Sequence, residues 1–219
     1  MRRKWFVPVV ALVVLVGCID YEDEMIISAD RSAEHRVAVA VSREFSEMDD
    51  APEGMGADAR GDLFEGFAGE GITVLSQESY EESKTNVYGQ EEIYDVEEIT
   101  VRYDDVAQAS NLDADGNSFT FEQRSDGSYV MRRRLEMEGA GDRGSEMDEM
   151  MELMRVLFAG NGFSFAVEMP GDVRIARVEG APDHLQPTWQ GSRVEWYLPF
   201  VEMMGAKEDF WLVVETAAR

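Results

Sequence analysis

The segment His35-Arg36-Val37-Ala38-Val39-Ala40-Val41-Ser42-Arg43 places valine at every second position, with small or polar residues between. A period of two is typical of a strand with one buried face. A shorter apolar stretch at 25–29 precedes it, and Asp30-Arg31-Ser32 between the two stretches suits a turn. The sequence therefore predicts a pair of strands near the beginning of the folded domain.

The same alternation returns later in the chain. Phe119 and Phe121 lie in one arm of a predicted hairpin, whose turn contains Asp126-Gly127 and supplies the positive φ of tight hairpins. On the other arm, Arg133 falls on the apolar face and is an exception to the pattern. Further strands are predicted at 163–169, 173–175, 192–198 and 210–214. The signal is weaker at 72–76 and 93–101, and 77–90 is a long polar stretch.

Helical signals are fewer. Asp62 can open a short helix that directs Phe64 and Phe67 inward, and 102–112 is a second candidate. The clearest helix begins after Ser145, where an acidic residue three positions on completes a capping box. Its apolar residues recur at helical spacing: Met147, Met150, Met151, Met154, Leu157 and Phe158. We therefore predict an α+β fold, an antiparallel β-sheet with two or three helices packed on one face.

The N-terminal residues predict export. A basic start at 2–4 and an apolar run at 5–16 lead to Gly17 and Cys18. This order defines a secretory signal peptide. A small residue before cysteine resembles the lipobox of bacterial lipoproteins, in which the thiol receives a diacylglyceryl group and the cysteine becomes the mature N-terminus. We therefore predict a lipoprotein signal peptide at 1–18 and lipidation of Cys18.

The apolar run is too short to cross a bilayer, which takes about 20 residues, and acidic residues follow it at once. We predict that 19–24 form a short acidic leader and that 25–219 form a single envelope domain. Cys18 is the only cysteine, so no disulfide is expected within the chain.

The charge is strongly negative. The chain has 20 basic and 45 acidic residues, a net charge of -25. Such a surface repels nucleic-acid phosphates, so we expect no nucleic-acid partner. The surplus acid suits solubility, including in a saline habitat, or the recruitment of a basic protein partner.

Two blocks of sequence carry a family resemblance. The first is Gly17-Cys18-Ile19-Asp20-Tyr21, followed by a strand, a turn and a strand. The second is Met169-Pro170-Gly171-Asp172-Val173, then a loop and Ser192-Arg193-Val194-Glu195-Trp196-Tyr197-Leu198. The arrangement resembles the LppM-type family of bacterial lipoproteins. This resemblance implies an α+β envelope domain that interacts with lipids or glycolipids and is not an enzyme. Many members carry a C-terminal membrane helix that this chain lacks, so Cys18 would be the sole anchor.

Catalytic patterns are absent from the sequence. The two histidines, His35 and His184, show neither metal-ligand nor triad spacing. There is no Gly-x-Ser-x-Gly, phosphate loop or His-Glu-x-x-His motif. We therefore expect a protein that is not an enzyme and that needs no cofactor beyond the lipid on Cys18.

Residues 111–122 partly match a calcium loop, with Asp113, Asp115 and Glu122 as the metal-ligand candidates. Position one of the loop is Asn111 instead of aspartate, and the residues that follow favour a strand over the exiting helix of such a site. Calcium is therefore not expected, and a calcium-dependent module is a third hypothesis.

The leading functional hypothesis is a lipid-anchored, non-catalytic module that binds an apolar or amphiphilic, lipid-like ligand between sheet and helices. The adaptable side chains of the methionine-rich helix are the ligand-binding candidates: Met147, Met150, Met151, Met154 and Phe158. The same residues also suit a plain core-facing stripe. The alternative is an acidic scaffold lipoprotein with a filled core. The predicted location is the outer membrane or periplasmic face of a two-membrane envelope, and otherwise the outer face of the cytoplasmic membrane.

Overall fold

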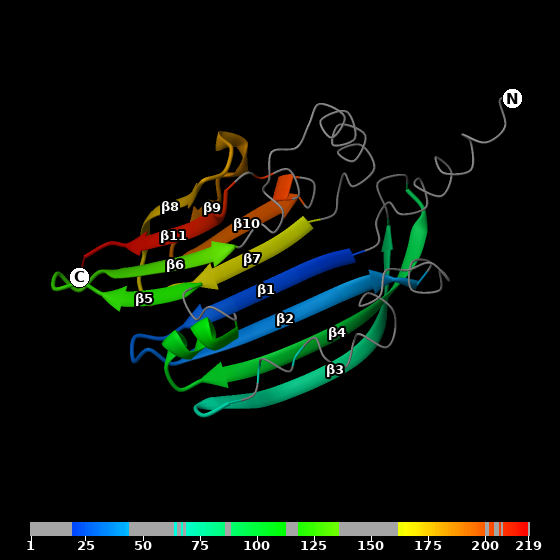
Figure 1. The fold of residues 1–219 in the computed structure, drawn as a ribbon, viewed down its shortest axis with the longest axis horizontal. Coiled ribbons are helices and arrows are strands. Elements are labelled where there is room, and N and C mark those ends of the chain that lie inside the picture. Colours follow the sequence, from blue (N-terminus) through cyan, green and yellow to red (C-terminus); the bar gives the residue numbers. More distant parts are fainter. Residues whose placement is uncertain are drawn as a thin grey trace, which may run out of the picture.

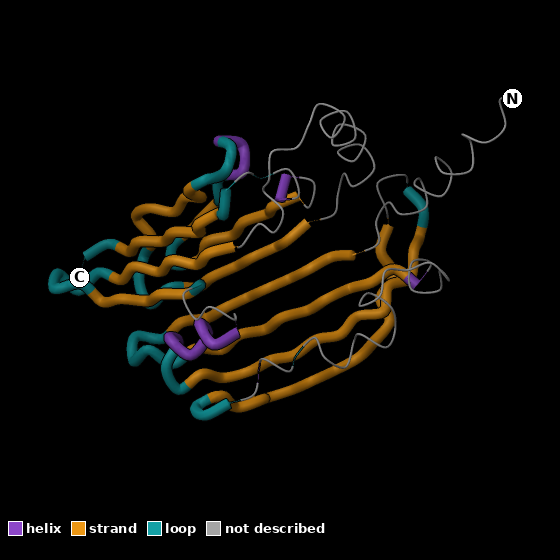
Figure 2. Tube along the Cα trace, viewed as in Figure 1, coloured by secondary structure: helices purple, strands orange, loops and turns teal. Residues whose placement is uncertain are grey.

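The computed structural model describes residues 19–43, 64, 67, 69–85, 89–112, 118–135, 162–199, 202–203, 206 and 208–218. These residues build two β-sheets (Figures 1 and 2). The seven strands of sheet A are, in spatial order, β3 (Ile72–Thr85), β4 (Glu91–Tyr103), β2 (Ala33–Ser42), β1 (Ile19–Ile27), β7 (Gly162–Glu168), β10 (Arg193–Pro199) and β9 (Thr188–Gln190). The four strands of sheet B are β5 (Phe119–Gln123), β6 (Tyr129–Leu135), β11 (Phe210–Thr216) and β8 (Val173–Glu179).

The strand pairings join segments far apart in the chain. β1 and β2 form the predicted antiparallel pair, with Met25 opposite His35. On its other side β1 runs parallel to β7, with Asp23 opposite Phe165. The remaining pairings between the strands described are antiparallel. The N-terminal hairpin and the C-terminal third therefore share one sheet.

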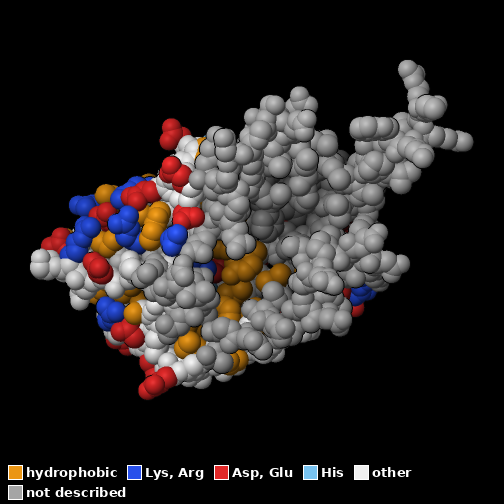
Figure 3. Space-filling view, in the orientation of Figure 1, with side chains coloured by type: hydrophobic (Ala, Val, Ile, Leu, Met, Phe, Trp, Pro, Cys, Tyr) orange, Lys and Arg blue, Asp and Glu red, His pale blue; other side chains and the backbone are white. Residues whose placement is uncertain are grey.

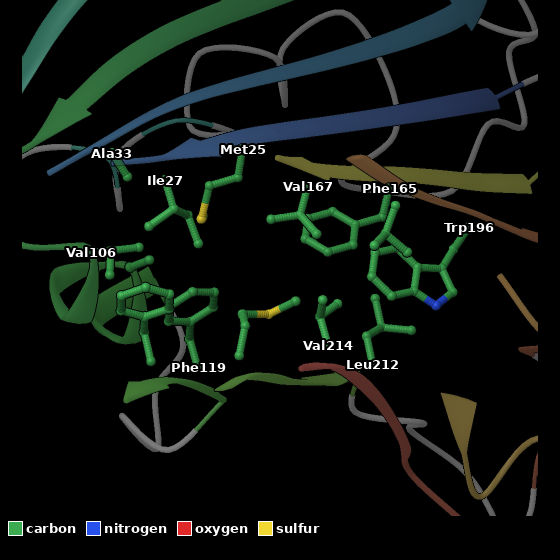
Figure 4. Packing of buried hydrophobic residues seen from close by; sticks show 14 of the residues in the cluster. Met25, Ile27, Ala33, Val106, Phe119, Phe165, Val167, Trp196, Leu212 and Val214 are labelled. Carbon is green, nitrogen blue, oxygen red and sulfur yellow. The ribbon is translucent and has the colours of Figure 1, made fainter. Parts of the chain in front are cut away.

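The two sheets pack face to face around an apolar core. Met25, Phe165 and Val167 extend from sheet A towards Leu212 and Val214 of sheet B (Figure 4). Met25 is 1% exposed, and Val167 and Val214 are 0% exposed. At about 25 cal/mol per Å² of apolar area buried, this interior is the main source of stability.

The prediction of helices packed on a sheet was wrong for the described residues. The layer that covers sheet A is a second sheet. Among the described helical segments, η3 (Val106–Leu112) and η4 (Asp183–Leu185) are short 3₁₀ turns. The predicted helix after Ser145 lies outside the described residues. Sheet B forms because its apolar residues alternate with polar ones and so give each strand one buried face.

Two other predictions differ in detail. β1 begins at Ile19, so the stretch predicted as an acidic leader belongs to a strand of sheet A. The polar stretch after Ser76 continues β3 as far as Thr85. β3 lies at the edge of sheet A and is exposed along most of its length, which leaves it without the apolar alternation that marks a half-buried strand. Phe64 and Phe67 are buried, as predicted.

Candidate functional site

A charged and hydrogen-bonded cluster lies between the sheets. In β1, Asp23 points inward, and its side chain is 0% exposed. It accepts a hydrogen bond from Nε2 of His35 to Oδ1 over 2.9 Å, and its Oδ2 lies 2.8 Å from Nη1 of Arg133. Nδ1 of His35 lies 3.0 Å from the hydroxyl of Tyr103. β1, β2, β4 and β6 each contribute one side chain to this cluster.

Both ring nitrogens of His35 have matching partners. Because a carboxylate only accepts hydrogen bonds, Nε2 of His35 donates to Asp23, and a neutral ring then accepts from Tyr103 at Nδ1. Arg133 also lies over aromatic rings, with Cζ 4.7 Å from the centroid of Phe165. The buried guanidinium therefore combines an ion pair with a cation–π contact.

The cluster shifts the pKa values of its members. Burial alone would raise the pKa of the Asp23 carboxyl, but Arg133 and His35 outweigh it and lower this pKa from 3.8 to about 2. Burial, with the nearby Asp23 charge, raises the pKa of the Tyr103 hydroxyl. It also raises the pKa of the neighbouring Tyr21 hydroxyl, which lies 3.4 Å from Oδ2 of Asp23. Asp23 is therefore ionised at neutral pH inside the core, where a buried charge needs its partners.

This Tyr–His–Asp chain is not placed to act on a substrate. His35 is 1% exposed and Tyr103 is 0% exposed, so neither ring reaches solvent. A catalytic base has to come within hydrogen-bond reach of a substrate proton. The arrangement therefore holds four strands together and offers no open catalytic centre.

The described surface is hollowed on the other side of sheet A. A groove of about 530 Å³ opens on the outer face, away from sheet B. Its floor includes the small residues Ser164 and Ala166 of β7. These positions alternate with the core residues Phe165 and Val167, which places them on the outer face. The remaining lining is Glu22, Asp23 and Glu24 of β1, Arg36 of β2, Phe165 of β7, Glu195, Trp196, Tyr197 and Arg193 of β10, Thr188 of β9, and His184 and Gln186.

Both signs of charge line the groove. Arg193 pairs with Glu24, and its Nε lies 2.7 Å from Oε1 of Glu195. Arg36 bridges Glu22 at 3.4 Å and Glu98 at 2.6 Å. The hydrogen bond from Arg36 lowers the pKa of Glu98, and hydrogen bonds to Glu195 and Glu24 raise the pKa of Arg193. The charged groups are thus held in place before any ligand arrives.

Two exposed aromatic side chains border this region. Tyr197 lines the groove and is 48% exposed, and Trp189 is 47% exposed. Trp189 lies in a neighbouring depression of about 370 Å³ that shares Thr188, Arg193 and Glu195 with the groove. An exposed ring beside paired charges gives a surface that can stack on a flat ligand face while donating and accepting hydrogen bonds.

Most residues singled out from the sequence lie elsewhere. Cys18, Asp113, Asp115 and the candidates Met147, Met150, Met151, Met154 and Phe158 lie outside the described residues. Glu122 is described and is exposed on β5. Within the described part of the chain, no group of three or more metal-ligating side chains comes together. Likewise, no helix in that part is long and apolar enough to cross a membrane.

Sequence reasoning missed both the buried cluster and the groove. The signal for the cluster was Arg133, the lone cation on an apolar strand face, which the structure pairs with Asp23. The acid itself gave no signal, because it stands among the acidic residues at the start of β1. The lining of the groove comes from separate strands, so local pattern does not assemble it.

Neither a family model nor a curated protein matches the chain. Among solved structures, the NMR structure of the folded domain of Mycobacterium tuberculosis LppM is similar, with 13% identity and a TM-score of 0.43. The alignment covers 93% of this chain and 91% of that chain. A TM-score below 0.5 does not establish a shared fold, so membership of the LppM-type family stays a prediction. The described residues themselves define the class of the domain as a two-sheet β-sandwich with a polar surface groove.

Proposed function

We propose that this chain is a lipid-anchored, non-catalytic module of the cell envelope that binds the hydroxyl-rich polar part of a ligand in the groove of sheet A. The observation that carries the proposal is the groove of about 530 Å³ with its paired charges. Carboxylates such as Glu24 accept hydrogen bonds from hydroxyl groups, and the guanidinium of Arg193 donates them. The exposed face of Tyr197 suits the apolar face of a sugar ring.

The interior gives less support to an apolar ligand. Between the described parts of the two sheets, Phe165, Met131 and Leu212 are each at most 1% exposed and fill the space. Protein interiors are close-packed, and a ligand tail needs a cavity that this packing does not leave. The ligand class favoured is therefore a saccharide, either free or as the headgroup of an amphiphile.

The anchor rests on Cys18 and the signal peptide before it. The start of β1 at Ile19 supports a short tether, since the domain begins directly after the predicted acylation site. The complete burial of His35 and Tyr103 supports a non-catalytic role for the one described chain of potential acid–base groups.

Binding can be tested by native mass spectrometry with two probes, free chitotetraose and a glycosyl diacylglycerol in nanodiscs. The informative variant is Ser164→Phe, which places a large ring on the groove floor. Its control is Thr120→Phe, which adds the same ring to an exposed position of sheet B. We expect Ser164→Phe to weaken binding at least about tenfold, which is about 1.4 kcal/mol, while the control binds normally. Binding to the nanodisc probe alone would identify the ligand as the headgroup of a lipid. Equal ligand affinity of Ser164→Phe and Thr120→Phe would contradict the proposal.

A second candidate is recruitment of a basic protein along β3. This strand forms an edge of sheet A as described, and it exposes Glu78, Glu81 and Glu82. An extended basic segment can add to such an edge through main-chain hydrogen bonds and charge pairs. A pull-down from envelope extract should then lose its partner in high salt and with Glu78→Lys. Capture that is insensitive to both would count against this candidate.

A further inference from the structure

The outer face of sheet B collects arginines in a chain that is otherwise strongly acidic. Arg132 of β6 and Arg177 of β8 lie in one row on either side of Val213 of β11. Arg174 of β8 and Arg124, which follows β5, lie near the same face through their contacts with Glu215. Val213 is 1% exposed, because long side chains on this face cover it.

These four arginines share two carboxylates. Glu179 lies 2.9 Å from Arg132 and 2.7 Å from Arg177. Glu215 lies 3.0 Å from Arg124 and 3.6 Å from both Arg174 and Arg177. The centre of the face therefore carries more guanidinium than carboxylate, in a chain whose net charge is -25.

The remaining charges of this face lie at its margins. Arg134 and Asp209 pair with each other at 2.6 Å, and Glu122 and Asp126 belong to the β5 side. On the β8 side, Arg174 and Arg177 stand against Glu179 and the exposed Asp172, and Arg174 is 60% exposed. Charges further than about 10 Å away are screened at physiological salt, so the local surplus governs what this face attracts.

An aromatic ring lies among the arginines. Trp211 of β11 is partly exposed, and Cζ of Arg132 lies 5.5 Å from the centroid of its ring. In Figure 3, blue, red and orange side chains intermingle at the end of the molecule where Figure 1 places β5, β6 and β11. Tryptophan and arginine together suit the headgroup layer of a membrane, because each has an apolar body and a polar end.

The lipid surface is close by if Cys18 is acylated. Ile19 is the first residue of β1 and pairs with Val41, so no spacer separates the acylation site from sheet A. Sheets in a sandwich lie about 10 Å apart, so the lipid on Cys18 has to span that layer for the outer face of sheet B to reach the same membrane. The outer face of sheet A carries Glu22, Glu24 and Glu195 beside Arg36 and Arg193, so acids outnumber bases there and the face is less suited to an anionic bilayer.

We infer that the domain lies with the outer face of sheet B on anionic headgroups of the membrane that holds Cys18. The acyl group and the arginines act as two signals, which stable membrane anchoring requires. The groove of sheet A then faces away from that membrane and stays open to its ligand. This inference rests on the lipid anchor of the proposed function and adds the orientation of the domain.

The test uses the mature lipidated protein in vesicles of phosphatidylcholine with about 30% phosphatidylglycerol, a fraction chosen to give an anionic surface. Brominated lipid quenches a tryptophan that reaches the headgroup layer. We expect quenching that disappears in Trp211→Phe and persists in Trp189→Phe, and that is absent in pure phosphatidylcholine. High salt should also remove it.

Charge variants identify the face. Each basic residue near an anionic surface contributes roughly a fivefold change in binding. Arg132→Gln and Arg177→Gln should each lower the docked-to-undocked ratio about fivefold. The matched control is Arg102→Gln, which removes an exposed guanidinium from β4 of sheet A and should leave quenching unchanged.

The outcomes separate the two claims. Loss of flotation with vesicles in the parent protein would overturn the lipid anchor. Flotation without quenching of Trp211 would overturn only the orientation, and it would favour an acidic protein as the partner of this face. Quenching that Arg132→Gln and Arg102→Gln reduce equally would also overturn the orientation.

Discussion

Replacing Arg133 by methionine should cost about 3 to 5 kcal/mol of unfolding free energy, because it leaves the Asp23 carboxylate charged and buried with one partner fewer. Methionine keeps the length of the aliphatic stem but loses the ion pair. It also loses the cation–π contact with Phe165, which adds about 1 to 2 kcal/mol in a desolvated site. The total loss is a large fraction of the 5 to 15 kcal/mol that typically separates folded and unfolded domains.

The assay is urea-induced unfolding followed by tryptophan fluorescence, with Arg132→Met as the control. Arg132 is the preceding residue, yet it lies on the opposite face in a partly exposed ion pair, so its loss should cost about 0 to 1 kcal/mol. The double variant Asp23→Asn/Arg133→Met should be less destabilised than the sum of its single changes, by about 1 to 3 kcal/mol. A loss below about 1 kcal/mol for Arg133→Met, or strict additivity in the double variant, would show that the buried pair of Asp23 and Arg133 does not stabilise the fold.

Three further outcomes are expected. The pKa of Asp23 is lowered from 3.8 to about 2, which stabilises the fold above pH 4 by roughly 2 kcal/mol. This stabilisation is lost as the pH falls through 2. In an acid titration followed by circular dichroism, the stability of Asp23→Asn should therefore depend less on pH than that of the parent protein. Gly180→Ala should lower the unfolding free energy measured by calorimetry by about 2 kcal/mol or more, because φ is +86 and the added Cβ meets the Asp209 carbonyl oxygen at 2.5 Å. Gly89→Ala is the control: φ is +78 but the added Cβ meets open space, so the loss should be about 1 kcal/mol. Leu212→Ala should lower the unfolding free energy by about 2 to 5 kcal/mol in urea, since Leu212 is 0% exposed; a loss under about 1 kcal/mol would contradict its place in the core.

Strands with one buried face could be predicted from the sequence. The segment around Val37 alternates because one side packs in the core, and β2 follows this pattern as far as Val37; beyond it, Ala38 and Ala40 on the other side are buried too. The same holds for β7, β10 and β11. Only the start of β3, at 72–76, could be found in this way. Most residues of this strand are exposed on both sides and therefore show no apolar alternation.

The layer opposite sheet A was predicted wrongly for a different reason. Apolar alternation predicts that a strand has a buried face but not which strand or helix covers that face. β11 joins β6 and β8 in a separate sheet through pairings between residues distant in sequence. Such pairings depend on the whole topology, so the strands were predictable while their division into two sheets was not.

The buried cluster shows a similar limit. An acidic residue is usually exposed, and Asp23 stands beside Glu22 and Glu24 in a stretch that resembles a solvated leader. Its burial depends on Arg133 and His35, which other strands bring to it. The one local hint was the cation on the apolar face of β6, because an arginine there needs an acidic partner.

Native mass spectrometry of the protein extracted from its own membrane tests the lipid anchor and the ligand together. We expect a chain that begins at an acylated Cys18 and carries one saccharide-containing ligand. Ser164→Phe should abolish that ligand, whereas Thr120→Phe should retain it. An unmodified Cys18, or a ligand that Ser164→Phe retains in full, would contradict this expectation.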